Sequence, residues 1–351
     1  MRHMASATQP SARPTRVCFV ALANDKEFWG ADRSLIDTID VLRERGIEPH
    51  VALPKAGGVV EQELAKRGVP FTVVGYRWWM GYKGLPAYKG FVRIVLSVLS
   101  SIKLAWLVRK WGSDLVYTNT AGICVGAMAA RWLKLPHLWH LREFVGEDHG
   151  LHFIVGESRA IRMIDRWSNV VVSNSRAVAG KFERDMPAGK MRVVHNMMRL
   201  NDKPPAPGDP VVPARTGRFR CVISGRVSES KGQVEAIRAV ALLKQQRVDV
   251  ELLILGEGKP TYMDEVNALV KELHVTDRVI FGGYVTNVFP FYRSSDVLLV
   301  CSKCEAFGRV TAEAMLCGMP VIGTNTGGTP ELVKEDVTGL LYTPGDVQKL
   351  A

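Results

Sequence analysis

With 351 residues, 47% of them hydrophobic, the chain is long enough for two domains and has a globular composition, which excludes an intrinsically disordered chain. Its six cysteines are scattered through apolar stretches, which excludes a disulfide scaffold and suits a reducing compartment. The net charge of +11 comes entirely from residues 1–214, because residues 215–351 contain 16 basic and 16 acidic side chains. This asymmetry favours an anionic partner for the N-terminal half over a solvated basic face without one.

Strand and helix signals alternate through the N-terminal half. Residues 17–23, "VCFVALA", are a short apolar run of the kind that a parallel sheet buries on both faces. Residues 31–46 follow with Leu35, Ile39 and Leu42 at helical spacing. Further strands are predicted at "PHVALP", "PFTVV", "DLVYTN", "LPHLWHL" and "NVVVSNS".

The pattern then stops and restarts. Residues 201–218 are rich in Pro, Gly and Asp and are predicted to be a linker. Strands follow at "RCVISG", "VELLILG", "RVIFGGY", "DVLLVCS", "PVIGT" and "GLLYT", the first two each followed by a helical pattern. We therefore expect an α/β protein with an N-terminal domain at 16–200 and a C-terminal domain at 219–351, both doubly wound. Residues 1–15 are expected to be a tag or disordered, and "GDVQKLA" begins a helix, so the second domain should lack its last helices.

Two glutamates, Glu305 and Glu313, flank a bare Phe-Gly in "SKCEAFGRVTAEA" (302–314), and three kinds of site would explain them. A zinc site using Cys301 and Cys304 fails, because no second Cys or His pair with metal spacing follows. An acid/base pair of the retaining-glycosidase kind needs carboxylates about 5 Å apart, and a loop-to-helix turn should hold these two farther apart. We therefore predict that they grip two ends of one elongated polar ligand.

Three loops that follow predicted strands contain groups that could bind an anionic central part of that ligand. The amides of Phe307 and Gly308 open a helix, where anions bind. The loop "TGGTPELV" has paired glycines before a helix with Thr329 as its expected N-cap, which predicts a phosphate cradle. Arg226 and Lys231 in "SGRVSESKGQ" could neutralise a diphosphate, although an ordinary solvated pair of cations is the alternative.

These motifs together carry a resemblance. "EAFGRVTAE" resembles the Glu-x7-Glu motif of retaining glycosyltransferases of family 4, and the sequence from there to "LLYTPGD" is similar to that family almost position by position. "SGRVSESKG", "LILGEGK" and "FWGADRSLIDTIDVLRERG" are similar too, so the resemblance covers nearly the whole chain after residue 15. It implies the GT-B fold, with two Rossmann-like domains facing a central cleft. A nucleotide-sugar donor would bind mainly to the C-terminal domain and an acceptor mainly to the N-terminal one.

The resemblance implies roles for residues of the C-terminal half. Glu305 would bind hydroxyls of the donor sugar, and Glu313 those of the ribose. Arg226 and Lys231 would hold the diphosphate and stabilise the leaving nucleotide. Val285 falls where relatives touch the base through the backbone. The full expected donor-binding set is Gly30, Arg226, Lys231, Val285, Glu305, Ala306, Phe307, Gly308 and Glu313.

Two N-terminal residues complete the expected site. Gly30 would let its loop approach the phosphates. His140 in "LWHLREF" matches the histidine that family members place near the reacting carbon, although a lone histidine is more often structural. His140 and Glu305 form the expected catalytic set. Trp29 and Asp32 depart from the glycine and glutamate that relatives carry at these positions.

The resemblance implies transfer of a hexosyl group with retention, by front-face attack in which the leaving diphosphate takes the acceptor's proton. No Asp-x-Asp motif occurs, so neither a metal nor a cofactor is expected beside the nucleotide-sugar co-substrate. Two alternatives stay open at this point. One is a nucleotide-sugar 2-epimerase or hydrolase of the same fold, and the other is a non-enzymatic protein that binds membranes or polyanions. Nucleic acid is not an expected partner.

Residues 76–112 contain seven Lys or Arg, eight aromatic residues and no acidic residue. Arg93 and Lys103 interrupt the apolar run, so we expect a poor membrane span. The segment predicts either a helix lying on an anionic membrane or a buried helix with a basic flank. On a membrane, the acceptor would be a lipid-linked saccharide or polyprenyl lipid for cell-surface polysaccharide or glycolipid synthesis. The protein would then be cytoplasmic, peripheral on the inner face of the cell membrane.

Overall fold

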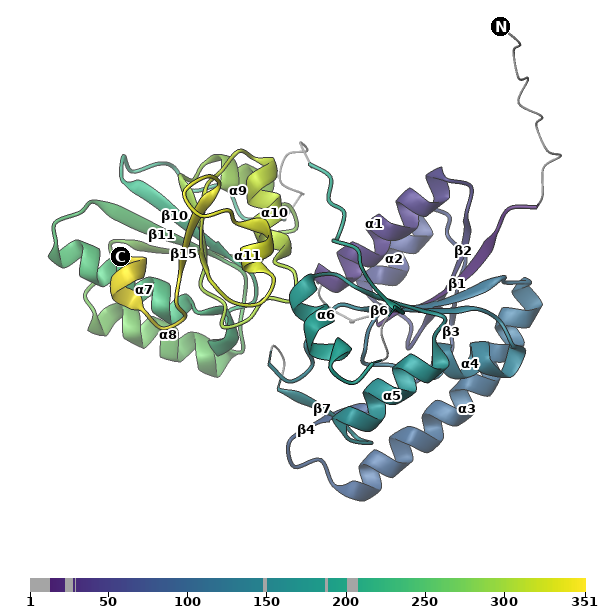
Figure 1. Ribbon diagram of the computed structural model, residues 1–351. Helices are drawn as coiled ribbons and strands as arrows, with labels where there is room; N and C mark the ends of the chain where they lie inside the picture. The colour runs from purple at the N-terminus through teal and green to yellow at the C-terminus, as the bar shows by residue number, and fades with distance from the viewer. Residues whose placement is uncertain (1–12, 23–27, 29, 148–149, 187–188, 201–207) are drawn as a thin grey trace, which may run out of the picture.

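The computed structural model describes residues 13–22, 28, 30–147, 150–186, 189–200 and 208–351. These residues form two parallel sheets with helices around each, side by side (Figure 1). We call the first sheet with its helices the N-terminal domain and the second the C-terminal domain.

The N-terminal domain is built on a seven-stranded sheet. Its strands are β1 (Arg16–Val20), β2 (Glu48–Leu53), β3 (Phe71–Val73), β5 (Leu115–Thr118), β6 (His137–Leu141), β8 (Val170–Ser173) and β9 (Met191–Val193). Their order is β3-β2-β1-β5-β6-β8-β9, and every pair is parallel. The chain therefore runs outward from β1 to one edge and then returns to build the other half, which is the doubly wound topology.

Helices cover both faces of this sheet. They are α1 (Gly30–Glu44), α2 (Val59–Lys66), α3 (Ala87–Trp111), α4 (Val125–Leu133), α5 (Glu157–Trp167) and α6 (Arg176–Glu183). Alternate residues of β1 point to opposite faces: Phe19 joins the cluster under α1, while Cys18 and Val20 join the cluster under α3 and α4. Burial on both faces explains why the strand reads as an unbroken apolar run.

The segment predicted at 76–112 is only partly a helix. It begins with core residues: the Tyr76 hydroxyl donates to the Ala52 carbonyl at 2.7 Å, and Trp79 Nε1 donates to Ala121 at 2.6 Å. A short strand, β4 (Met80–Tyr82), then pairs antiparallel with β7 (Leu151–Phe153). The helix α3 follows and packs against α4. By length and composition alone, α3 is also a candidate membrane span.

The C-terminal domain repeats the same plan. Its strands are β10 (Phe219–Ser224), β11 (Val250–Leu255), β12 (Val279–Gly283), β13 (Val297–Val300), β14 (Val321–Thr324) and β15 (Gly339–Tyr342). They form one parallel sheet in the order β12-β11-β10-β13-β14-β15. The helices are η1 (Glu229–Lys231), α7 (Gln233–Gln245), α8 (Pro260–Glu272), α9 (Phe289–Arg293), α10 (Arg309–Leu316), α11 (Thr329–Leu332) and α12 (Val347–Leu350). Two doubly wound α/β units confirm the predicted fold class.

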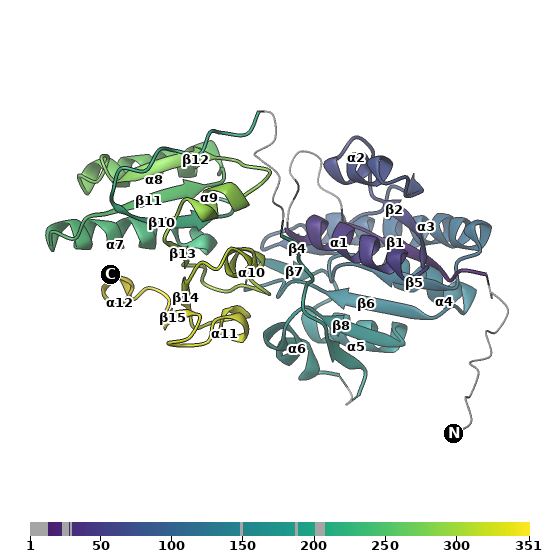
Figure 2. The ribbon, with the colours of Figure 1, turned by 90° about the horizontal axis from the view of Figure 1, so that it is seen from above.

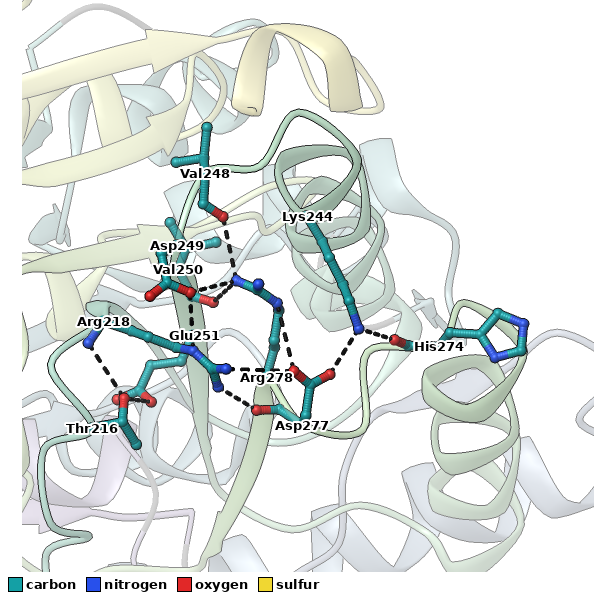
Figure 3. A network of polar contacts seen from close by, with 10 residues as sticks. All are labelled: Thr216, Arg218, Lys244, Val248, Asp249, Val250, Glu251, His274, Asp277 and Arg278. Atoms are coloured by element: carbon teal, nitrogen blue, oxygen red, sulfur yellow. Dashed lines mark hydrogen bonds and ion pairs between the residues drawn. The ribbon is translucent and has the colours of Figure 1, made fainter.

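Charged side chains tie together the amino ends of β10, β11 and β12 (Figure 3). Asp249 accepts hydrogen bonds from both Arg218 and Arg278 at 3.0 Å, and Asp277 accepts one from Lys244 at 2.8 Å. Ligands of α/β sheets bind at the opposite, carboxyl edge. We therefore assign this network to the stability of the C-terminal domain.

The two domains meet through α10 and α11 on one side and α1 and α6 on the other (Figure 2). Arg33 of α1 donates to the carbonyl of Thr286, in the loop after β12, at 2.9 Å. Glu331 of α11 accepts from the backbone amides of Arg176 and Ala177, both at 2.8 Å. Polar contacts thus join the domains, and the carboxyl edge of the second sheet faces the first domain.

Candidate active site

The expected donor-binding residues lie at one edge of the C-terminal sheet. Lys231 ends η1 after β10, Val285 follows β12, and Glu305 follows β13. Because the carboxyl ends of parallel strands share one edge, these loops are neighbours in space although they are far apart in sequence. The edge faces the junction between the domains.

Glu305 is held by two neighbouring side chains. Its Oε1 accepts hydrogen bonds from Lys231 Nζ and from Ser302 Oγ, each at 2.5 Å, and its side chain is mostly buried. A cation and a hydroxyl on one oxygen fix the direction of the carboxylate. Arg226, the other expected diphosphate ligand, has an exposed side chain nearby in the β10–η1 loop.

The loop with paired glycines packs tightly against the Glu305 loop. A Cβ on Gly327, which has φ +58°, would come within 2.3 Å of the Glu305 carbonyl oxygen, so only glycine fits there. The Gly328 amide donates to that carbonyl at 2.7 Å. The prediction of Thr329 as N-cap is wrong, since α11 starts at Thr329 with Gly328 before it and has no side-chain cap. The glycines hold the Glu305 loop by close packing, and the Gly328 amide is already used.

Glu313 occupies a buried position on α10 with its own cation. Arg309 Nε donates to Glu313 Oε1 at 2.8 Å, one turn apart on the helix. Burial raises the pKa of Glu313, while the nearby Arg309 and Arg33 act against that rise. Glu305 and Glu313 therefore sit in separate electrostatic settings, each with a different cation.

His140 lies near the carboxyl end of β6 and is buried. Its Nδ1 is hydrogen-bonded to the Tyr117 hydroxyl, whereas its Nε2 has no hydrogen-bond partner among the described residues. Burial, and secondarily the charge of Arg142, lower the pKa of His140 well below its usual range, so the imidazole is neutral. One nitrogen is fixed as in a structural histidine, and the other is an orphan of the kind that a ligand can satisfy.

The Glu305 loop contacts the N-terminal domain directly. Cys304 and Ala306 pack against the N-terminal core cluster that contains Leu141, the residue after His140. The ring of Phe307 lies 5.7 Å from that of His195. The loop of one expected catalytic residue thus packs on the same core cluster to which the strand of the other contributes.

The remaining expected residues also lie near the junction. Gly30 is the first residue of α1, and a Cβ built on it would lie 3.8 Å from Arg309 Cδ of the other domain. Val285 is buried. Asp32 is buried as well, and Trp29 lies outside the described residues.

The two cysteines that suggested a metal site differ in their surroundings, since Cys301 is buried and Cys304 only partly so. Burial raises the pKa of Cys301 to about 12, so the thiol is protonated at neutral pH. Within the described part of the chain, no three His, Cys, Asp or Glu side chains are placed to hold an ion.

Comparison with known families decides between the remaining interpretations. The family model described as "Glycosyltransferase Family 4" matches residues 29–201, and the one described as "Glycosyl transferases group 1" matches residues 209–351. The chain belongs to glycosyltransferase family 4. The predicted family is therefore confirmed, and the GT-B fold with it.

Relatives of this family 4 member have diverse names. It is 44% identical over 104 residues to N-acetyl-alpha-D-glucosaminyl L-malate synthase of Bacillus anthracis, which covers 30% of this chain and 27% of that protein. It is 29% identical over 318 residues to D-inositol 3-phosphate glycosyltransferase of Streptomyces scabiei, which covers 85% and 66% respectively. The matched region thus spans less than two thirds of the length of these curated relatives.

Solved structures agree on the fold of this family 4 member. Anabaena Alr3699/HepE in complex with UDP-glucose is similar with a TM-score of 0.73 and 25% identity, over 96% of this chain and 87% of that one. The apo form of the lipopolysaccharide outer core galactosyltransferase WaaB has a TM-score of 0.69 at 17% identity, over 96% and 88%. The second likeness concerns the fold alone.

Sequence reasoning missed the groups that join the domains in this family 4 member. Arg309 contacts Asp37, and Glu331 contacts α6 and His195. Arg309 stands inside the quoted motif between Gly308 and Glu313, so its position was a usable signal. The sequence gives no signal that Asp37 is the partner of Arg309, because no sequence pattern pairs residues of different domains.

Proposed function

We propose that the protein transfers a hexosyl group from a uridine-diphosphate sugar to an acceptor hydroxyl, with retention and without a metal ion. The observation that carries this proposal is the packing of the Glu305 loop, through Cys304 and Ala306, on the N-terminal core cluster that contains Leu141. The choice of uridine rests on HepE, whose complex contains UDP-glucose. Family membership supports a transferase over an epimerase, a hydrolase or a non-enzymatic protein.

The donor would lie along the carboxyl edge of the C-terminal sheet. Glu305 and the amides of the three residues after it would bind the sugar, and Glu313 the ribose. Lys231 and Arg226 would hold the diphosphate, and the backbone at Val285 would face the base. Lys231 already contacts Glu305 at 2.5 Å, so a phosphate beside it would place the sugar next to that carboxylate.

The proposed reaction needs no side chain as nucleophile. The bond between the anomeric carbon and the diphosphate oxygen breaks, the acceptor oxygen bonds to that carbon on the same face, and the acceptor's proton passes to the leaving diphosphate. Lys231 and Arg226 would stabilise the negative charge that develops there. His140, neutral because burial lowers its pKa, would orient the sugar through Nε2, with Tyr117 fixing the other nitrogen.

A panel of UDP-, GDP- and ADP-sugars tests the donor. Binding at about 100 times Kd stabilises a protein by about 2.7 kcal/mol, which raises Tm measurably. We expect UDP-sugars to raise Tm and the other two classes not to. No shift with any nucleotide sugar would refute the proposal.

Products test the reaction class. Donor incubated without acceptor should stay intact, whereas an epimerase would isomerise it and a hydrolase would release the sugar. With acceptor, NMR of the product should show the anomeric configuration of the donor, and EDTA should not reduce the rate. Inverted product or loss of activity in EDTA would remove the corresponding part of the proposal.

A specific observation favours a membrane-bound acceptor. The outer face of α3 exposes Phe91, Leu99, Ile102 and Trp106, with exposed fractions between 50% and 70%. The ammonium of Lys110 lies 5.2 Å from the Trp106 ring. The opposite face is fixed to the domain, because residues such as Leu104 and Val108 are buried. An apolar face with aromatic residues and flanking cations is the pattern of a helix that lies in a bilayer surface.

Charge argues for an anionic bilayer as the occupant of this face. The segment 76–112 has seven basic residues and no acidic one, so a second copy would bring like charges together. Anionic headgroups would attract the same residues by about 1 kcal/mol each. We therefore propose that the protein docks through α3 on the inner, cytoplasmic face of the cell membrane, with a lipid-linked saccharide or polyprenyl lipid as acceptor.

Vesicle flotation tests this docking. We expect binding to vesicles with phosphatidylglycerol, weaker binding to phosphatidylcholine alone, and loss of binding in Leu99→Glu and Trp106→Glu. Leu340→Glu, at an exposed leucine of the C-terminal domain, is the matched control. Dimers without vesicle binding would assign the face to a second copy instead. Transfer to soluble acceptors only would refute the lipid acceptor.

A further inference from the structure

Arg309 forms ion pairs with one carboxylate from each domain. Its Nε donates to Glu313 Oε1 at 2.8 Å within α10, and its Nη1 donates to Asp37 Oδ2 of α1 at 2.7 Å. The same Nη1 lies 3.3 Å from Ser34 Oγ. All these side chains are largely shielded from solvent, with 16% of Arg309 exposed. Figure 2 shows α10 on the side of the C-terminal domain that faces α1.

The backbone around Arg309 fixes this position. Gly308 has φ +86°, a left-handed conformation, and turns the chain so that Arg309 becomes the first residue of α10. On the other side, Gly30 opens α1, and a Cβ there would lie 3.8 Å from Arg309 Cδ. The guanidinium is therefore enclosed between the start of α10 and the start of α1. Its planar fork can serve two carboxylates at once, which an ammonium cannot do with the same geometry.

We propose that Arg309 is a positioning residue that couples the binding of the nucleotide's ribose to the closure of the two domains. Through its contact with Glu313, Arg309 orients that carboxylate toward the donor. Through its contact with Asp37, it holds α1 against the donor site. The inference rests on the proposed function, because it takes Glu313 as the ribose ligand.

The charges around Glu313 explain why removing Arg309 should have two separate effects. The groups that face Glu313 are Arg309 on its own helix, Arg33 and Asp37 on α1, and the Tyr292 phenol on α9. Burial already raises the pKa of Glu313, and the Asp37 carboxylate adds to the rise while the two arginines oppose it. Without Arg309, two carboxylates would face each other across the junction, which favours domain opening and protonation of Glu313.

Protonation of Glu313 should weaken UDP binding, an effect that would not be expected if Arg309 had a purely structural role. An ionised carboxylate accepts from both ribose hydroxyls, whereas a protonated one loses acceptor capacity. Affinity for UDP should therefore fall as the pH falls through the pKa of Glu313. In Arg309→Gln this fall should move to higher pH. Arg309→Lys keeps the charge, so it should restore the pH profile, but it should not restore closure.

The experiment measures UDP affinity by calorimetry from pH 5.5 to 8.5 and domain closure by small-angle scattering with and without UDP. Arg309→Gln should bind UDP about 10- to 100-fold more weakly at pH 7.5, the loss expected for a hydrogen bond to a charged group. Arg199→Gln is the matched control, because Arg199 pairs with Glu44 of the same α1 at an exposed site. It should match wild type in both measurements.

Asp37→Asn tests domain closure separately from the orientation of Glu313. It also keeps the proposal testable if the Arg309→Gln variant misfolds. It should impair UDP-dependent closure while leaving the Arg309–Glu313 contact and the direction of the pH profile intact. Unchanged affinity and pH profile in Arg309→Gln, or unchanged closure in Asp37→Asn, overturns the coupling. If wild type itself binds no UDP, the proposed function fails instead, so the two failures are distinguishable.

Discussion

Glu331 of the C-terminal domain accepts a hydrogen bond from the backbone amide of Arg176 at 2.8 Å, at the first residue of α6 in the N-terminal domain. The amide of Ala177 donates to the same carboxylate, and His195 Nε2 lies 3.1 Å from it. A carboxylate is favoured at a helix N-terminus because it meets unpaired amides and the positive end of the helix dipole. A side chain of one domain thus completes a helix of the other.

We expect Glu331→Ala to loosen this junction. Two charge-assisted hydrogen bonds are lost, which should weaken the closed arrangement by about 1–3 kcal/mol. Scattering should show a larger radius of gyration, and proteases should cut the junction faster. Glu335→Ala, at an exposed glutamate of the same domain, should leave both unchanged. An equal effect of the two substitutions would contradict a specific role for Glu331.

We expect Lys231→Ala and Glu305→Gln to reduce kcat more than they change KM. Both residues are proposed to act on the reacting part of the donor, and loss of one preorganised electrostatic group costs about 10²- to 10³-fold in kcat. Because the side chains are in contact at 2.5 Å, the double variant should lose less than the product of the single losses. Initial rates with a UDP-sugar give these values.

Lys303→Ala provides the control for charge alone, since Lys303 is an exposed lysine two residues before Glu305. It should retain near-normal kcat. Losses that multiply fully in the double variant would mean that Lys231 and Glu305 act independently.

The fold could be predicted from the sequence because its signals are local. Strands such as β13 are unbroken apolar runs buried on both faces, and α1 shows Leu35 and Ile39 at helical spacing. The strands β4 and β7 were not predicted, because each has three residues and gains its identity only by pairing with the other. The residue type of Thr329 predicts an N-cap, but the packing of Gly327 against Glu305 decides how the loop runs.

Only part of the candidate site could likewise be predicted from the sequence. Glu305, Glu313 and Lys231 follow strand ends in one domain, so topology alone places them at a shared edge. The link from Arg309 to Asp37 depends on how two separately folded domains meet. No periodicity or motif encodes that arrangement in a single sequence.

We expect breaking the buried ion pair between Arg220 and Glu251 to destabilise the C-terminal domain strongly. Arg220 Nε donates to Glu251 Oε1 at 2.5 Å, and both side chains are fully or almost fully buried. The other Glu251 oxygen accepts from Thr216, which Figure 3 shows beside Glu251. Glu251→Ala should leave the buried charge of Arg220 without a carboxylate and cost about 3–5 kcal/mol in the free energy of unfolding.

The surface network above it gives a matched control. Arg218 pairs with Asp249, whose side chain is 66% exposed, so Arg218→Ala should cost about 1 kcal/mol or less. Urea unfolding of both variants measures the difference. Equal losses would show that burial does not set the strength of these pairs.

We expect stability to fall when the pH drops below about 6.5, the usual pKa of an unfolded histidine. Burial lowers the pKa of His137 to about 3 and that of His140 well below its usual range. The unfolded chain therefore binds protons between pH 6.5 and the folded pKa that the native protein does not. Each residue then contributes a loss of up to about 1.4 kcal/mol per pH unit as the pH falls, and nothing above pH 6.5.

Urea unfolding of wild type and His137→Gln at pH 5 to 8 tests this dependence. In the native protein, His137 is hydrogen-bonded to Thr118 and Ser168, so the variant should be less stable at pH 8. Its stability should nevertheless fall less steeply than that of wild type below pH 6.5, because one buried neutral imidazole is gone. His152→Gln, at an exposed histidine, should keep the wild-type slope. Parallel pH curves for wild type and His137→Gln would mean that His137 is not the group whose protonation unfolds the protein in acid.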